Sequence, residues 1–329
     1  MTSCIRKLPL APVSLAVLLA FTCLACGAKE VGATDVPTDL PADIPSFDVP
    51  QPDGPADAPA DVPIPESLGG VRPAALFVPD DYTPARAWPL VIALHGYATS
   101  GFLMAAWFGL VERVTPMGFV LLAPDGTLNS QDKMFWNAWP SCCNFDAAAV
   151  DDVTYLRGLI GEAVNVLSVD PARVYLLGYS NGGFLSLRAA CDAADVITGI
   201  ASLGGSMTGS VPCQPSRPVS ILAIQGTADD TIAYDGGSYE NLPAHLGVQA
   251  VVDGWVQRDK CVQPSATVGE PVDFDAAVAG AETQQTSWQG CGEGARVDLW
   301  RMEGSGHAPE LTEPFKDAVL GHLLSLSAP

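Results

Sequence analysis

Residues 174–183 read VYLLGYSNGG, and a helical pattern beginning FLSLR follows them directly. An apolar strand therefore runs into Gly178, Ser180 and Gly182, and a helix begins at once. This context predicts a sharp strand-to-helix turn that holds Ser180 in a strained backbone conformation. Side chains two residues away on either side would collide there, and glycine removes the collision. Because the N-terminus of the helix points at the serine hydroxyl, where negative charge would develop, we expect Ser180 to be a nucleophile.

Apolar runs alternate with longer helical patterns on both sides of this turn. Expected strands cover residues 74–78, 90–94, 119–123, 173–177, 199–203, 221–224 and 297–301, and expected helices cover residues 103–114, 151–167, 182–190, 244–257 and 314–326. Continuously apolar strands, such as VIAL at residues 91–94, are typical of a parallel sheet with helices on both faces. The alternation predicts an α/β fold with a mostly parallel central sheet.

A serine hydroxyl needs a base to become a good nucleophile, and the sequence offers four histidines. His245 and His322 fall inside helical patterns. His95 follows an early strand, too early for a base that comes after the nucleophile and the acid along the chain. His307 ends the loop GSGH after the last expected strand, which is where that order places the base.

The acid that orients this base is expected in the loop after the strand at 221–224. This loop reads QGTADD and offers two adjacent carboxylates, of which we prefer Asp229 and keep Asp230 as the alternative. The oxyanion needs two backbone amides. These are expected from Asn181, which follows the nucleophile, and from Tyr97, in the turn after the strand at 90–94. Such chemistry requires no metal ion and no organic cofactor.

The N-terminal part of the chain carries export signals. A basic pair precedes an apolar run over residues 8–24, which predicts a signal peptide over residues 1–26, with a transmembrane anchor as the alternative. The run ends CLACG, which resembles a bacterial lipobox. Cys26 is therefore a candidate for acylation, against simple cleavage and secretion. We expect an exported protein, either extracellular or attached to the cell envelope.

Residues 27–69 are rich in Asp, Pro and Ala, which predicts an extended, solvated tether. The remaining residues, 70–329, are expected to form one catalytic domain. The formal net charge of −21 provides no basic surface for nucleic acid. We expect no nucleic-acid partner, a membrane contact only through the lipid anchor, and a monomer.

Six cysteines follow residue 26, and an even number in an exported chain predicts disulfides. Neighbours along the chain suggest the pairs Cys191 with Cys213 and Cys261 with Cys291. The adjacent Cys142 and Cys143 are either a vicinal pair or partners of something else. Because six cysteines allow 15 pairings, sequence alone leaves the connectivity open.

Five short motifs occur in a recognisable order: HGY at 95–97, CC at 142–143 with VDDV at 150–153, GYSNGG at 178–183, GTAD at 226–229 with YDGG at 234–237, and GSGH at 304–307. Together they resemble the secreted esterase family of the α/β-hydrolase fold, which groups polyhydroxybutyrate depolymerase-like proteins with feruloyl and acetylxylan esterases. The resemblance spans about residues 72–325. It implies Asp229 as the triad acid, the two disulfides named above, and a cleft for esters of large polymers or their fragments.

Several residues depart from the pattern of that family. Gln225 stands where a histidine commonly begins the Gly-Thr-x-Asp motif, and Ala233 stands where proline is common. Such positions are expected to shape the cleft. Trp136 and Trp139 lie in a loop that could provide a flat apolar wall for an aromatic acyl group, although packing beneath the loop is the alternative.

The sequence therefore predicts a serine ester hydrolase that acts on polymer-derived esters, feruloyl-esterase-like on plant cell-wall polysaccharide. Depolymerisation of polyhydroxybutyrate and deacetylation of xylan would use the same three residues. A surface-tethered binding lipoprotein without turnover is the alternative from another class. The strained turn disfavours it, because a pure binding protein has little reason to keep such a feature.

Overall fold

The computed structural model describes residues 64–262 and 267–327. The predicted signal peptide, Cys26 and most of the predicted tether lie outside these residues. The described residues belong to the unit Pro55–Pro329. Its first strand, β1 (Ser67–Leu68), pairs with β2 (Ala74–Phe77), so strand pairing begins before residue 70.

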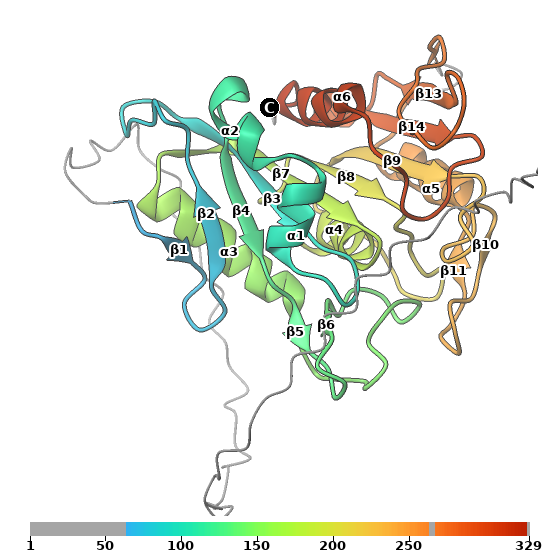
Figure 1. Ribbon diagram of the computed structural model, residues 1–329, viewed down its shortest axis with the longest axis horizontal. Helices are drawn as coiled ribbons and strands as arrows, with labels where there is room; N and C mark the ends of the chain where they lie inside the picture. The colour runs from blue at the N-terminus through green and yellow to red at the C-terminus, as the bar shows by residue number, and fades with distance from the viewer. Residues whose placement is uncertain (1–63, 263–266, 328–329) are drawn as a thin grey trace, which may run out of the picture. The chain divides into compact units, whose positions relative to one another are not determined.

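A ten-stranded sheet forms the centre of this unit (Figure 1). Six neighbouring strands are parallel, in the spatial order β4 (Val120–Pro124), β3 (Trp88–Leu94), β7 (Val169–Tyr179), β8 (Gly199–Leu203), β9 (Ser220–Gly226) and β14 (Val297–Met302). The antiparallel strands lie at the two edges, β1 and β2 at one, and β13 (Thr283–Trp288) and β12 (Thr267–Val268) at the other. The predicted α/β fold with a mostly parallel sheet is confirmed.

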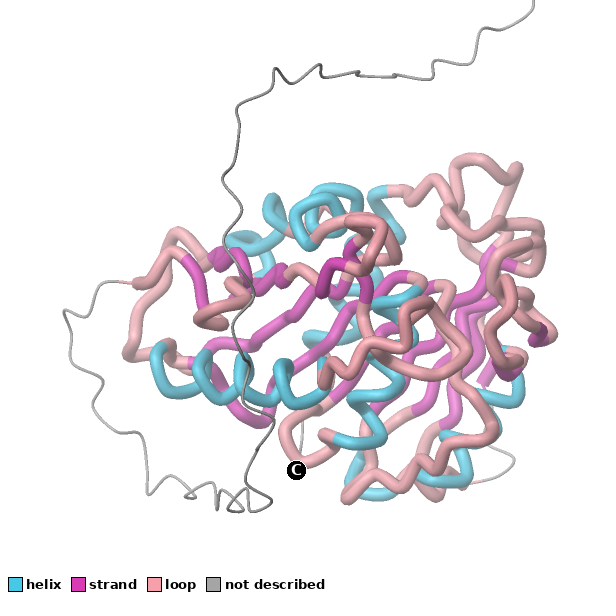
Figure 2. The backbone as a smooth tube through the Cα atoms, turned by 90° about the horizontal axis from the view of Figure 1, so that it is seen from below, coloured by secondary structure: helices cyan, strands magenta, loops and turns pink. Residues whose placement is uncertain are grey.

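Successive side chains of the central strands enter two different cores. Leu90 and Ile92 belong to the core that includes α3 (Asp152–Val166), α4 (Asn181–Asp192) and α5 (Val248–Arg258). Val91 and Ala93 belong to the core that includes α1 (Gly101–Trp107), α2 (Val111–Met117) and α6 (Glu313–Leu324). Figure 2 shows helices on both sides of the strands. Burial on both faces explains the continuous apolar runs in these strands, such as residues 90–94 of β3.

Two expected helices differ from the structure. The helix expected at 103–114 is divided into α1 and α2, because Gly109 adopts a left-handed conformation with φ of 57°. The helix expected at 244–257 begins only at Val248, because His245 belongs to the short strand β11 (His245–Leu246), which pairs with β10 (Gly236–Gly237). A second short hairpin joins β5 (Thr127–Leu128) to β6 (Met134–Phe135), and a 3-10 turn covers Gly292–Gly294.

Three disulfides are present in the described residues. Cys191, near the end of α4, is joined to Cys213, and Cys261, just after α5, is joined to Cys291. The adjacent Cys142 and Cys143 form a third, vicinal disulfide. Among the described residues, no helix has the length and apolar character that crossing a bilayer would require.

Candidate active site

The turn between β7 and α4 holds Ser180 in a strained conformation with positive φ, at φ of 52° and ψ of −118°. The flanking glycines are required by their surroundings. A Cβ at Gly178 would lie 2.2 Å from the carbonyl oxygen of Gly182, and a Cβ at Gly182 would lie 2.0 Å from the carbonyl oxygen of Leu94. Both distances are far below van der Waals contact. The two glycines therefore allow the serine to stand at the carboxyl end of the parallel strands.

Three side chains from three loops form a hydrogen-bonded row. His307, in the loop after β14, places Nε2 2.9 Å from Oγ of Ser180 and Nδ1 2.8 Å from Oδ2 of Asp229. A carboxylate can only accept, so Nδ1 carries the proton and Nε2 can accept the hydroxyl hydrogen. The structure thus brings together the three residues that the sequence pointed to. Asp230, the alternative acid, is exposed and accepts a hydrogen bond from Thr231.

The carboxylate of Asp229 is held by four donors. Oδ1 accepts from the amides of Thr231 at 2.9 Å and Ile232 at 2.7 Å. Oδ2 accepts from His307 and also from Nε2 of Gln225, at 2.8 Å each. The departure of Gln225 from the family pattern predicts that its side chain shapes the cleft. That prediction is wrong, because the side chain is buried behind the acid and also donates to the carbonyl oxygen of Ile232.

The loop after β3 is fixed by a buried histidine. The amide of Gly126 donates to Nε2 of His95 at 2.8 Å, so Nδ1 carries the proton and donates to the carbonyl oxygen of Gly96 at 2.7 Å. Burial lowers the pKa of His95, which keeps the ring neutral. In the described part of the chain, the amides of Tyr97 and Asn181 have no acceptor. Both are therefore available for the oxyanion role that the sequence predicts.

The side chain of Asn181 ties the start of α4 to a second loop. Its Oδ1 accepts from the amide of Trp136 at 2.7 Å, and its Nδ2 donates to the carbonyl oxygen of Trp136 at 3.0 Å. The indole of Trp136 in turn donates to the carbonyl oxygen of His95 at 3.0 Å. This network fixes both candidate amide donors relative to each other. Sequence reasoning missed it, because no local pattern signals a contact between loops 45 residues apart.

The prediction that Trp136 and Trp139 wall the substrate cleft is wrong. Both side chains are fully buried, and the indole of Trp139 donates to the carbonyl oxygen of Phe184 at 3.0 Å. A buried indole needs an acceptor for its N–H, and backbone carbonyls supply one in each case. The two tryptophans pack beneath the loop, which is the alternative that the sequence left open.

A pocket of about 170 Å³ opens beside the serine hydroxyl. Its walls are largely aromatic or apolar, and comprise Tyr97, Tyr179, Tyr239, Ile232 and the disulfide between Cys142 and Cys143. Burial raises the pKa of Tyr179 to about 12, so its phenol is uncharged at neutral pH. Phe145 meets the ring of Tyr97 edge-on, with 5.4 Å between the ring centroids, and extends this aromatic surface. The described residues contain no cluster of metal-ligating side chains.

A family model described as phospholipase/carboxylesterase matches residues 82–241, which include the strained turn and Asp229. Feruloyl esterase B of Piromyces equi is 28% identical over 238 residues, which cover 70% of this chain and 41% of that protein. The putative esterase NocK of Nocardia uniformis subsp. tsuyamanensis is 28% identical over 246 residues, which cover 71% of this chain and 69% of the relative. This chain is similar to carboxylic ester hydrolases of the α/β-hydrolase fold.

A solved structure agrees with this fold. The acetyl xylan esterase from Aspergillus awamori aligns with a TM-score of 0.53 and 12% identity, over 76% of this chain and 94% of that protein. At this identity the match concerns the fold alone. The chain spans less than half the length of the Piromyces relative.

Proposed function

We propose that the protein is an exported serine esterase that hydrolyses esters of aromatic acids, in the manner of a feruloyl esterase. The observation that carries this proposal is the hydrogen-bonded row of Ser180, His307 and Asp229 beside a pocket lined by three tyrosines. The relative named feruloyl esterase B supports it.

The geometry supports acyl transfer in two steps. Ser180 Oγ attacks the ester carbonyl while its proton passes to Nε2 of His307, and the buried Asp229 stabilises the resulting imidazolium. The amides of Tyr97 and Asn181 donate to the oxyanion. His307 then protonates the leaving alcohol. A water molecule, deprotonated by the same nitrogen, attacks the acyl-enzyme and releases the acid.

The size of the pocket favours an aromatic acyl group over acetate. Cavities of about 150 Å³ with apolar walls can hold a benzene ring, and the pocket measures about 170 Å³. An acetyl group would leave most of this space to water. Tyrosine rings offer edge and face contacts to a second ring, worth about 0.5–1.5 kcal/mol beyond the buried area. Acetylated xylan and 3-hydroxybutyrate oligomers are therefore the secondary candidates.

The test compares methyl ferulate with a short-chain aryl acetate, using the disulfide-bonded protein and Ser180→Ala as the blank. We expect the higher kcat/KM on methyl ferulate. Tyr239→Ala is expected to lower kcat/KM on methyl ferulate by about 10-fold, because an aromatic contact and buried apolar area are lost. It should leave kcat/KM on the aryl acetate unchanged. The matched variant Tyr239→Phe keeps the ring and should match wild type. A preference for acetate would favour acetylxylan esterase activity, and a folded but inactive wild type would favour the binding protein.

We also propose that the protein is exported and anchored through Cys26. Three disulfides in the described residues fit an oxidising compartment. The signal peptide and Cys26 themselves lie outside the described residues, so this proposal depends on the sequence. Mass spectrometry of the mature N-terminus is expected to show an acylated Cys26. An unmodified N-terminus would contradict the anchor while leaving export in place.

A further inference from the structure

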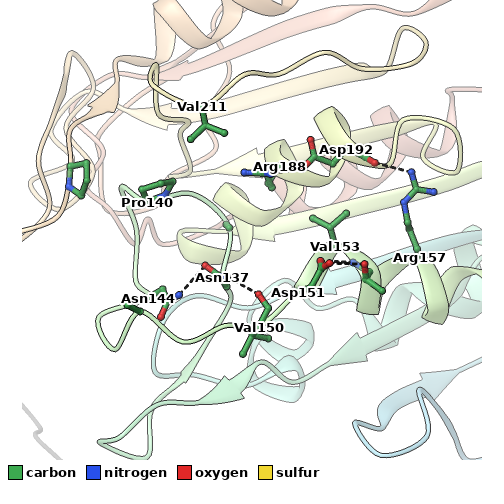
Figure 3. Close-up of a pocket in the computed structure, with 14 residues that line it drawn as sticks. Asn137, Pro140, Asn144, Val150, Asp151, Val153, Arg157, Arg188, Asp192 and Val211 are labelled. Atoms are coloured by element: carbon green, nitrogen blue, oxygen red, sulfur yellow. Dashed lines mark hydrogen bonds and ion pairs between the residues drawn. The ribbon is translucent and has the colours of Figure 1, made fainter. Parts of the chain in front are cut away.

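A groove of about 770 Å³ lies between α3, α4 and the loop 137–150 (Figure 3). None of the three candidate catalytic residues lines it. Its polar side chains come from all three elements, and include Asn137, Asn144, Thr154, Arg157, Arg188 and Asp192. The groove is therefore larger than the pocket at Ser180 and is lined by other residues.

One loop borders both hollows. Pro140 and Asn144 line the groove, whereas Cys142 and Cys143, which lie between them in sequence, line the pocket at the serine. The two sides of an ester need separate space, because the acyl group and the alcohol extend in opposite directions from the carbonyl carbon. A pocket of about 170 Å³ with room for one ring cannot also hold a sugar chain. The alcohol must lie outside it, and the groove is on the other side of the same loop.

Hydrogen bonds hold the loop wall of the groove. The amide of Asn137 donates to the buried carboxylate of Asp152 at 2.6 Å, and Nδ2 of Asn137 donates to the carbonyl oxygen of Val150 at 2.7 Å. Nδ2 of Asn144 donates to Oδ1 of Asn137 at 3.0 Å, as Figure 3 shows. A wall held in this way is formed before a ligand arrives, which lowers the entropic cost of binding.

The charges of the groove favour a neutral ligand. Two arginines, Arg157 and Arg188, are balanced among the lining residues by two aspartates, Asp151 and Asp192. Each arginine is also paired, Arg157 with Asp195 at 2.6 Å and Arg188 with Asp192 at 2.5 Å. No excess of either sign remains to attract an ion. Guanidinium, amide and hydroxyl groups beside small apolar side chains suit a polyhydroxylated ligand.

Arg188 is the best placed donor for such a ligand. Its guanidinium lies over the ring of Trp139, 4.9 Å from the centroid, and only its Nε is used by Asp192. Its two terminal nitrogens have no acceptor among the described residues. A guanidinium fixed by stacking and by one ion pair presents its remaining N–H groups in a set direction.

We propose that this groove binds the neutral oligosaccharide that carries the ester, on the alcohol side of Ser180, with Arg188 as a specificity-determining residue. The proposal rests on the proposed function, since it assigns the alcohol half of the same substrate. It predicts that the protein distinguishes a feruloylated oligosaccharide from methyl ferulate by KM, because only the first ester reaches the groove.

The test measures both esters with Arg188→Gln, beside Arg86→Gln as the control. Arg86 is matched because it also stacks on a tryptophan, Trp88, and pairs with an aspartate, but it does not line the groove. Arg188→Gln is expected to raise the KM for a feruloylated arabinoxylan oligosaccharide by about 3- to 10-fold, the effect of one or two lost hydrogen bonds. Its kcat/KM on methyl ferulate should match wild type. Arg86→Gln should match wild type both in its KM for the oligosaccharide ester and in its kcat/KM on methyl ferulate.

A second variant keeps the test decisive if Arg188→Gln folds poorly. Val211→Phe places a ring in the groove and removes no hydrogen bond, and it should raise the same KM. An unchanged KM for the oligosaccharide ester in both variants, or an equal change for both esters, would overturn the groove proposal. Failure of the proposed function looks different, because wild type would then not hydrolyse methyl ferulate. Calorimetry with the unesterified oligosaccharide would still detect the groove in that case.

Discussion

Ser180→Ala, His307→Ala and the double variant are each expected to lower kcat on methyl ferulate by about 10⁶-fold. The single losses should not add, because nucleophile and base act as one unit across the 2.9 Å contact between Oγ and Nε2. Without the imidazole the hydroxyl keeps its proton, and without the hydroxyl the imidazole has no proton to remove. The residual rate should come from the oxyanion amides and from substrate binding.

Steady-state assays of highly purified variants, with thermal unfolding to verify the fold, measure this effect. Ser130→Ala is the matched control, because this serine is exposed and its amide and hydroxyl donate to the carboxylate of Asp146. It should retain the wild-type kcat. If the double variant loses a further large factor beyond either single change, the two residues act independently and the proposed unit is incorrect.

The turn at the nucleophile could be predicted because its requirements are local. Gly178 and Gly182 are required because a Cβ at either position would clash within the turn or with the neighbouring strand. This requirement appears in the sequence as the Gly-x-Ser-x-Gly motif. The strands of the parallel sheet were equally predictable, since burial on both faces demands continuous apolar runs. By contrast, β13, next to the edge strand β12, reads TQQTSW, whose polar side chains give no such signal.

The walls of the site could not be predicted, because they depend on contacts between distant loops. A tryptophan that is buried beneath a loop needs an acceptor for its indole N–H. For Trp136 that carbonyl belongs to His95, 41 residues away. The sequence predicts an oxyanion role for the backbone amide of Tyr97. It does not indicate that the ring of Tyr97 lines the pocket together with Tyr239.

Asp229→Asn is expected to lower kcat by about 10⁴-fold with little change in KM. Oδ2 of the acid accepts from His307 and Gln225, and Oδ1 accepts from two backbone amides, so every contact of this carboxylate requires an acceptor. An asparagine must place an NH₂ group against one of these donors. If the NH₂ faces His307, the imidazole carries its proton on Nε2 and cannot accept the hydroxyl hydrogen of Ser180.

The neighbouring Asp230→Asn is the matched control, since it makes the same chemical change one residue away on an exposed side chain. It should keep the wild-type kcat, and equal losses in the two variants would remove Asp229 from its assigned role. Gln225→Leu extends the series, because it deletes one donor and leaves the carboxylate intact. A lost hydrogen bond to a charged group costs about 1.5–3 kcal/mol, so we expect a kcat about 10- to 100-fold below wild type. Gln225→His, the residue common in the resembling family, can restore that donor and should recover most of the rate.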